Sequence, residues 1–244
     1  ELLKIILDGY VKKGKVLIPV FGVGRPQEML LVIEHLIKEE RLPKDLKVYI
    51  DGMVWETTAI HTAYPEFLNR YLRGRILKGD NPFTIPNFME VNGRVHRQEI
   101  CDSQDHAVVI ATSGMLNGGT SVEYFKQFAE HEDNSIIFVG YQAAGTLGRK
   151  VKEGEKDILL ANTGSADDRI KVKMGVHQMK GAFSAHSDLG LTKKFLANLS
   201  VKPKKIILDH GEASKIQYFA EVAKKIIPGV KTYTPDNLET IRLN

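Results

Sequence analysis

Residues 15–28, KVLIPVFGVGRPQE, join an apolar run to a turn that contains glycines, and an amphipathic segment follows as far as about Glu40. A short apolar run that ends in a turn is typical of a buried strand. The glycines allow a tight turn into the helix that follows, so the pattern predicts a strand, a turn and a helix. The N–H groups that begin this helix, together with Arg25, can hold a phosphate. A lone Gly-x-Gly is, however, more often only a tight turn.

The same succession of strand, turn and helix returns twice along the chain. Residues 107–112 precede the turn at 113–120, and residues 134–140 precede the turn at 141–150. This alternation predicts an α/β fold with a mostly parallel sheet and helices on both faces. Because parallel strands end at one edge of the sheet, the turns are expected to line one groove that fits a polyphosphate such as RNA. The residues expected around this groove are Arg25, Ser113, Gly114, Thr146 and Arg149.

Two histidines follow apolar runs near the end of the chain. His186 lies in GAFSAHSD at residues 181–188, and His210 lies in LDHGE at residues 208–212. We expect residues 172–179, a helix capped by Asp188, and residues 205–208 to form one strand–helix–strand unit that brings both imidazoles to one edge. Imidazole can bind zinc or transfer a proton near neutral pH, although a histidine in a turn is more often only polar surface.

The composition is that of a globular protein without a membrane helix. The chain has 244 residues, of which 43% are hydrophobic and 26% charged, enough for one large domain or two small ones. No apolar run approaches the roughly 18 residues of a membrane span, and no signal peptide opens the chain. The single cysteine, Cys101, predicts a reducing, cytoplasmic location. A net charge of +4 permits a nucleic-acid partner but does not require one.

The remaining segments complete the expected order of elements. An amphipathic helix at residues 1–13 is expected to end at Gly14 as its C′ residue. The other expected elements are a strand at 46–51, a helix at 54–75 interrupted at Pro65, a loop at 79–92, helices at 95–102 and 215–227, and a strand at 230–233. The chain starts inside a helix and without methionine, so we expect it to be part of a longer protein.

Five motifs within these turns occur together: IPVFGVGRPQE at 18–28, ATSGML at 111–116, GYQ at 140–142 with GTL at 145–147, FSAHSD at 183–188, and HGE at 210–212. In this combination the chain resembles the β-CASP branch of the metallo-β-lactamase superfamily. These RNA-processing nucleases include the endonuclease of the cleavage and polyadenylation specificity factor. YIDGMVWE at 49–56 and NLETIRL at 237–243 look most like the archaeal form. The resemblance implies a β-CASP domain at residues 1–180 and the C-terminal segment of a metallo-β-lactamase αββα domain at 181–244.

The resemblance also implies chemical roles. His186 would donate a proton to the leaving oxygen, and His210 would bind one of two zinc ions that activate a hydroxide and stabilise the scissile phosphate. The glycine turns would clamp single-stranded RNA, which adds Met115, Tyr141 and Ser184 to the expected RNA-binding residues. The family's His-x-His-x-Asp-His metal motif does not occur in this sequence. We therefore expect that the N-terminal half of the lactamase domain is missing, and that the chain alone binds zinc weakly and is inactive.

The implied function is that of a zinc-dependent ribonuclease of RNA 3′-end processing or termination. The balance between endonuclease and 5′-to-3′ exonuclease activity stays open, as does an RNA-binding module before the missing half. A non-catalytic β-CASP scaffold or RNA-binding subunit is the alternative, and retention of His186 and His210 favours the enzyme. A nucleotide-binding domain would need a Gly-x-Gly-x-x-Gly or P-loop fingerprint, and neither is present. An exposed apolar edge and the archaeal resemblance both predict homodimers.

Overall fold

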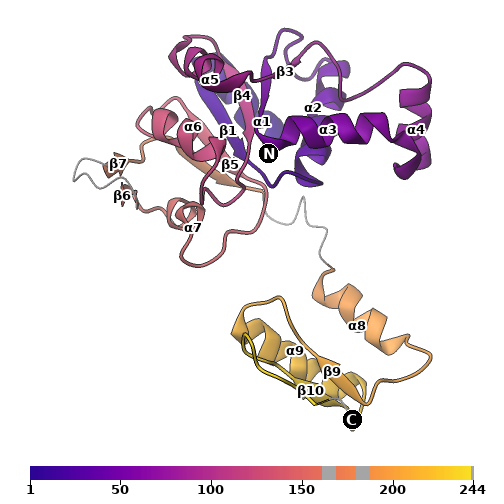
Figure 1. Cartoon of the computed structure of the whole chain (residues 1–244). Coiled ribbons are helices and arrows are strands. Elements are labelled where there is room, and N and C mark those ends of the chain that lie inside the picture. The colour runs from indigo at the N-terminus through magenta and orange to yellow at the C-terminus, as the bar shows by residue number, and fades with distance from the viewer. Residues whose placement is uncertain (161–168, 180–186, 243–244) are drawn as a thin grey trace. The chain divides into compact units, whose positions relative to one another are not determined.

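The computed structural model describes residues 1–160, 169–179 and 187–242, and it divides the chain into two compact units (Figure 1). The first unit is Glu1–Phe183 and the second is Ser184–Asn244. Each unit has its own sheet and its own buried cluster of apolar side chains. Within the described residues, no helix is both long enough and apolar enough to span a membrane.

The first unit is built on a six-stranded sheet with the order β3-β2-β4-β1-β5-β8. All its neighbouring strands run parallel, which confirms the predicted α/β fold with a mostly parallel sheet. Its strands are β1 (Lys15–Pro19), β2 (Val48–Asp51), β3 (Phe88–Glu90), β4 (Ala107–Ala111), β5 (Ser135–Phe138) and β8 (Gly175–Gln178). A separate antiparallel pair, β6 (Asp157–Leu159) and β7 (Arg169–Lys171), was not predicted.

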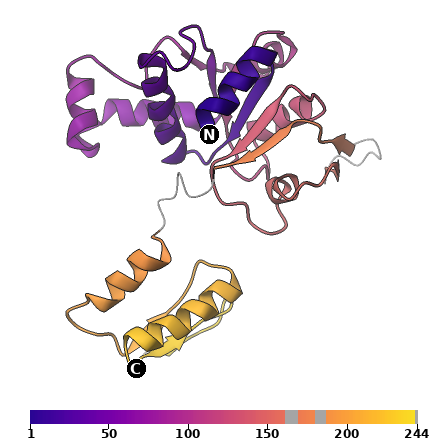
Figure 2. The same ribbon diagram turned by 180° about the vertical axis from the view of Figure 1, so that it is seen from behind.

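Helices cover both faces of this sheet (Figures 1 and 2). On one face lie α1 (Leu2–Lys12), α2 (Arg25–Lys38) and α3 (Met53–Ala63), and the chain continues from α3 into the 3-10 turn η1 (Pro65–Phe67) and α4 (Arg70–Leu77). On the other face lie α5 (Gly93–Asp102), α6 (Thr120–Phe128) and α7 (Leu147–Lys152). The helical stretch predicted at residues 54–75, with its interruption at Pro65, is confirmed.

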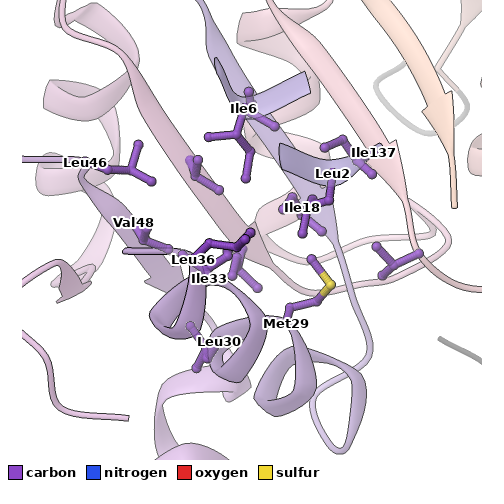
Figure 3. Close-up of a cluster of buried hydrophobic side chains, with 14 of the residues drawn as sticks. Leu2, Ile6, Ile18, Met29, Leu30, Ile33, Leu36, Leu46, Val48 and Ile137 are labelled. Carbon is purple, nitrogen blue, oxygen red and sulfur yellow. The ribbon is translucent and has the colours of Figure 1, made fainter. Parts of the chain in front are cut away.

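The two faces follow from the alternation of side chains along each strand. In β1, Val16 and Ile18 belong to the core cluster under α1 and α2, whereas Leu17 belongs to the cluster under α6. Figure 3 shows Ile18 beside Met29 and Ile33 of α2. Successive strand residues point to opposite faces, so a strand covered on both sides is apolar throughout. This explains why β1 and β4 have the continuous apolar runs seen in the sequence.

Two local predictions in the first unit were wrong. The segment at 79–92 was expected to be a loop, but it contains β3, an edge strand whose only buried residue is Phe88. Such a short strand has too few apolar residues to produce a pattern. Gly14 was expected to take the left-handed C′ conformation, but Lys13 takes it, with φ 57°. Gly14 is instead placed where an added Cβ would overlap the carbonyl of Asp133.

The second unit is a small α/β layer. Its parallel strands are β9 (Lys205–Ile207) and β10 (Lys231–Tyr233), and its helices are α8 (Leu189–Ala197) and α9 (Ala213–Ile226). Its buried core consists of Leu196, Ala223, Ile227 and Val230. Asp188 caps α8, as predicted, because its Oδ1 accepts the N–H of Leu191 at 2.7 Å.

The strand–helix–strand unit predicted around the two histidines was wrong. The strand before His186, β8, pairs with β5 in the sheet of the first unit, whereas β9 pairs with β10 in the second unit. The apolar pattern of each strand was identified correctly, but it does not specify the strand beside which it pairs. Strands that follow each other in sequence pair in most folds, and here they do not.

Candidate functional site at the carboxyl edge of the sheet

The first unit has a switch point between two neighbouring strands. β1 and β4 pair side by side, but the helices that follow them, α2 and α6, pack on opposite faces of the sheet. The turns after these strands therefore lead to helices on opposite faces of the sheet, and we name the place at the carboxyl edge where the two paths diverge the crevice. In open α/β sheets, ligands bind at this position. Both helices begin at the crevice, so the positive end of each helix dipole lies there.

A small hollow lies at this crevice. It is lined by Pro19, Val20, Phe21, Arg25, Gly114, Val139 and Gly140, from the ends of β1, β4 and β5. An added Cβ at Gly114 would lie only 3.0 Å from the backbone of Val20 and Phe21. The absence of a side chain there lets the turns after β1 and β4 approach each other. Phe21 was not singled out from the sequence, although its place directly after the apolar run of β1 was a usable signal.

The turn after β1 places Arg25 at the start of α2. Gly24 has φ 86°, a conformation that favours glycine, and its N–H donates to Oε1 of Gln27 at 2.7 Å. The amide of Gln27 in turn donates to the hydroxyl of Thr58 in α3 at 3.0 Å, which fixes the first turn of α2. The guanidinium of Arg25 pairs with the carboxylate of Glu28 one turn later. A phosphate at this site would therefore have to compete with that carboxylate.

The turn after β4 is held by its own hydroxyl groups. The hydroxyl of Ser113 donates to the carbonyl of Gly118 at 3.0 Å and accepts the N–H of Asn117 at 3.0 Å. Gly119, with φ 73°, has no room for a Cβ, which would lie 2.8 Å from the carbonyl oxygen of Thr112. Ser113 was predicted to bind phosphate, and the structure gives its hydroxyl partners within the loop.

The turn after β5 contacts the turn after β4. The amide of Gln142, fully buried, donates to the carbonyl of Gly114 at 2.9 Å, and the N–H of Gly148 donates to the carbonyl of Met115 at 2.9 Å. These bonds join two of the three turns that the sequence predicted at one edge, and the close approach of Gly114 to Val20 and Phe21 brings in the third. Gln142 was missed as a site residue, because nothing in its local sequence indicates that its side chain crosses to another turn.

Three predicted residues lie on the turn after β5. Thr146 is buried and caps α7: its hydroxyl accepts the N–H of Arg149 at 3.2 Å and donates to the carbonyl of Ala143 at 2.7 Å. The guanidinium of Arg149 pairs with Glu153 at 2.6 Å. The ring of Tyr141 is about half exposed. Thr146 therefore has structural partners in its own turn, and Tyr141 presents an aromatic surface near the hollow.

A buried carboxylate at the end of β2 was also missed. Asp51 accepts from the guanidinium of Arg97 at 2.8 Å and from the hydroxyl of Tyr124 at 2.9 Å. Burial, with Asp51 nearby, holds the pKa of Tyr124 well above its usual range, and the bond to Asp51 raises the pKa of Arg97. This network joins β2, α5 and α6 beside the crevice. The position of Asp51 between an apolar run and Gly52 was the sequence signal that could have identified it as a site residue.

The two predicted catalytic positions lie after the first unit's sheet. His186 and Ser184 fall outside the described residues. His210 is exposed in the turn after β9, with φ 64°, and its N–H donates to Oδ1 of Asp209 at 2.6 Å. In the described ranges, no three His, Cys, Asp or Glu side chains cluster in a way that could hold a metal ion. A zinc site needs three or four protein ligands, so His210 does not make one by itself.

The fold and the turns agree with a comparison to known protein families. The Beta-Casp domain matches residues 26–151, which is more than half of the chain, and the Zn-dependent metallo-hydrolase RNA specificity domain matches residues 169–235. The chain belongs to the Beta-Casp family. The first match includes the turns after β2, β4 and β5, and the second includes β8 together with the described part of the second unit as far as β10.

Among known proteins, the chain is similar to archaeal proteins named transcription termination factor FttA. It is 46% identical over 244 residues to that of Methanococcus maripaludis and 46% identical over 244 residues to that of Methanocaldococcus jannaschii. It is 45% identical over 245 residues to that of Thermococcus kodakarensis. These alignments cover 100% of this chain but only 37–38% of each relative. The chain thus spans less than two fifths of the length of these relatives.

Proposed function

We propose that this chain is the RNA-binding and C-terminal catalytic portion of a zinc-dependent ribonuclease of RNA 3′-end processing or transcription termination. Single-stranded RNA binds in the crevice between the turns after β1 and β4. The observation that carries this proposal is the switch point, where the N-termini of α2 and α6 and the hollow beside Gly114 meet. The names of the relatives and of the RNA specificity domain support the choice of substrate.

Phosphate binding in the crevice relies on backbone groups and exchangeable cations. The hydroxyls of Ser113 and Thr146 already have partners in their own turns. At the start of α2 and α6, Pro26 has no N–H, and the N–H groups of Arg25 and Ser121 donate to backbone carbonyls. What attracts an anion there is the partial positive charge of each helix N-terminus. Arg25 and Arg149 each pair with a carboxylate that is about half exposed. Surface pairs of this kind are worth about 0–1 kcal/mol, so RNA phosphates can replace those carboxylates.

The catalytic residues of the proposal are His186 and His210. His186 serves as the proton donor to the leaving oxygen, and His210 as one zinc ligand. Two zinc ions, when bound in the longer protein, would supply the nucleophilic hydroxide and stabilise negative charge on the phosphate. We assign the other ligands to the part of the longer protein outside this chain, and we expect the chain alone to bind zinc weakly and to be inactive. In the domain assignment, residues 1–180 form the β-CASP domain and residues 181–244 close the lactamase domain.

The second unit supports a proposal about assembly. Its described part has only six buried apolar residues, four of them in one cluster, while Phe195, Val201 and Leu238 are exposed. Exposed apolar groups of this kind favour association, and we propose that the chain forms a homodimer. Sedimentation velocity over a concentration series should show a dimer, and a monomer at the highest concentration would contradict it. The half-buried Cys101, whose pKa burial raises to about 11, fits the proposed cytoplasmic location as an unreactive thiol.

RNA binding by the 244-residue chain across a salt series tests the crevice. We expect the double variant Arg25→Ala, Arg149→Ala to bind oligouridylate more weakly. The logarithm of the binding constant falls linearly with the logarithm of the salt concentration, and the slope of this line (the salt slope) should decrease in size by about 0.7 for each lost phosphate contact. The matched control is Arg41→Ala, Arg169→Ala, which removes two exposed arginines elsewhere that are also ion-paired. Equal binding by the wild type and the crevice variant would refute the proposed site.

The full-length protein separates the ribonuclease from the non-catalytic scaffold. Both the ribonuclease hypothesis and the scaffold hypothesis require the same crevice, so RNA binding alone does not distinguish them. If the protein is a ribonuclease, His186→Ala should abolish RNA cleavage while leaving RNA affinity within about twofold of the wild type. A full-length protein loaded with zinc that binds RNA without cleaving it would favour the scaffold.

A further inference from the structure

The aromatic side chains exposed on the first unit gather in two places. Among its described residues, Phe21 and Tyr141 lie at the crevice, and the other exposed Phe and Tyr side chains lie together at residues 64–78, which we name the α4 arm. The arm consists of Tyr64, η1 and α4, up to Lys78. Phe67 is 84% exposed and Tyr71 is 71% exposed. Side chains of this size are normally buried, so such exposure on neighbouring turns indicates a binding surface.

The charge of the α4 arm is strongly one-sided. Residues 64–78 contain four basic residues and a single acidic one, Glu66. Arg75 is held by Glu34 and Asp80, but in the described part of the chain Arg70, Arg73 and Lys78 have no carboxylate partner. Arg70 and Arg73 are three residues apart on α4 and therefore share one face of the helix. The crevice arginines, by contrast, are both ion-paired.

The arm is held in one geometry before any ligand binds. The side chain of Asn69 accepts the N–H of Leu72 at 2.9 Å and so caps the start of α4. The guanidinium of Arg75 donates to Glu34 at 2.6 Å and lies over the ring of Tyr71, 5.9 Å from its centroid. Because the carboxylate of Glu34 is almost completely buried, this contact anchors α4 to α2. Because the ring is already fixed, little side-chain entropy is lost when a flat ligand stacks on it.

We propose that the α4 arm is a second binding site for single-stranded RNA. Bases stack on Phe67 and Tyr71, and phosphates contact Arg70, Arg73 and Lys78. Aromatic rings with unpaired cations are the combination that binds single strands without sequence preference. A protein partner fits less well, since the centres of protein interfaces are depleted of charge and of lysine in particular.

The arm is connected to the crevice by α3. Met53, at the start of α3, lies close to Gly22 in the turn after β1. From there α3 runs for 11 residues, about 16 Å, towards η1 and α4 (Figure 1). This inference rests on the proposed function, in which the RNA first binds in the crevice. An RNA bound there reaches the arm only if it is long enough. Affinity is therefore expected to depend on RNA length.

Fluorescence anisotropy with two labelled oligouridylates tests the arm in the 244-residue chain. One has about 5 nucleotides, near the smallest site of single-strand-binding folds, and the other about 20. We expect Phe67→Ala, Tyr71→Ala to weaken binding of the longer oligonucleotide by about tenfold or more, since stacking on each aromatic ring contributes substantially. Arg70→Gln, Arg73→Gln should weaken it similarly and lower the salt slope by about 1.4.

Controls separate the arm from the crevice. Lys4→Gln, Lys12→Gln removes two exposed charges from α1 and should leave both affinities within about twofold of the wild type. The arm is refuted as an RNA-binding site if its variants bind the longer oligonucleotide as tightly as the wild type does, while Arg25→Ala, Arg149→Ala weakens that binding. The proposed crevice site would then stand. If instead the arm variants weaken binding and Arg25→Ala, Arg149→Ala does not, the crevice is refuted as an RNA-binding site and the arm is supported. Self-association lost in the arm variants, with RNA binding unchanged, would show that the arm binds protein instead.

Discussion

Replacing Asp51 with asparagine is expected to destabilise the first unit substantially. The carboxylate of Asp51 is buried, and it holds the guanidinium of Arg97 at 2.8 Å and the hydroxyl of Tyr124 at 2.9 Å. Asparagine has nearly the same shape but no charge. The substitution therefore removes the counter-ion of Arg97 without opening a cavity, so the measured effect reports on electrostatics and not on packing.

The size of the effect follows from the burial of both partners. Removing one member of a buried ion pair costs about 3–5 kcal/mol, because the other charge stays desolvated and unpaired. Two features favour the lower end of that range: the amide oxygen still accepts from Tyr124, and Arg97 keeps its exposed partner Glu123 at 2.7 Å. We expect the free energy of unfolding to fall by about 3 kcal/mol. For a unit of this size the melting temperature should fall by about 6–12 °C.

Urea unfolding followed by tryptophan fluorescence measures this loss in the first unit alone. Trp55 is the only tryptophan of the chain, and it packs against the core of the first unit. Glu123→Gln is the matched control, because it removes the exposed partner of the same arginine and should cost at most about 1 kcal/mol. In the double variant Asp51→Asn, Arg97→Gln, the two losses should not add, since the first already breaks the contact. Strict additivity, or equal losses for Asp51→Asn and Glu123→Gln, would refute the reasoning.

Further predictions concern packing, pH and the turns. Gly14→Ala should lower the melting temperature by several degrees in circular dichroism, because its Cβ would overlap the carbonyl of Asp133; an unchanged melting temperature would contradict this. Burial lowers the pKa of His106, so the unfolded chain binds more protons and the unfolding free energy should fall as pH drops below about 6.5. His106→Gln should flatten that dependence in urea titrations, and an unchanged slope would argue against it. Gln142→Glu removes the amide that donates to Gly114 and should weaken oligouridylate binding at constant salt, whereas full affinity would show that this bond does not shape the crevice.

The sequence predicted the elements that local patterns specify. Apolar runs that end in glycine turns identified β1, β4 and β5, and the helices after them followed from amphipathic spacing. Those features depend on residues within a few positions of each other. Since parallel strands end at one edge, the meeting of three turns was also predictable. The short strand β3 was missed because one buried residue, Phe88, makes no pattern.

Only the tertiary structure decided which strands pair and which side chains meet. The place of β4 between β1 and β2 creates the switch point, and no local pattern encodes it. Asp51 meets a residue 46 positions away, Arg97, and another 73 positions away, Tyr124. The strand β8 joins β5 rather than the strand that follows it. These contacts close long loops, and their stability depends on burial that arises only when the whole sheet is assembled; the residue types alone therefore could not specify them.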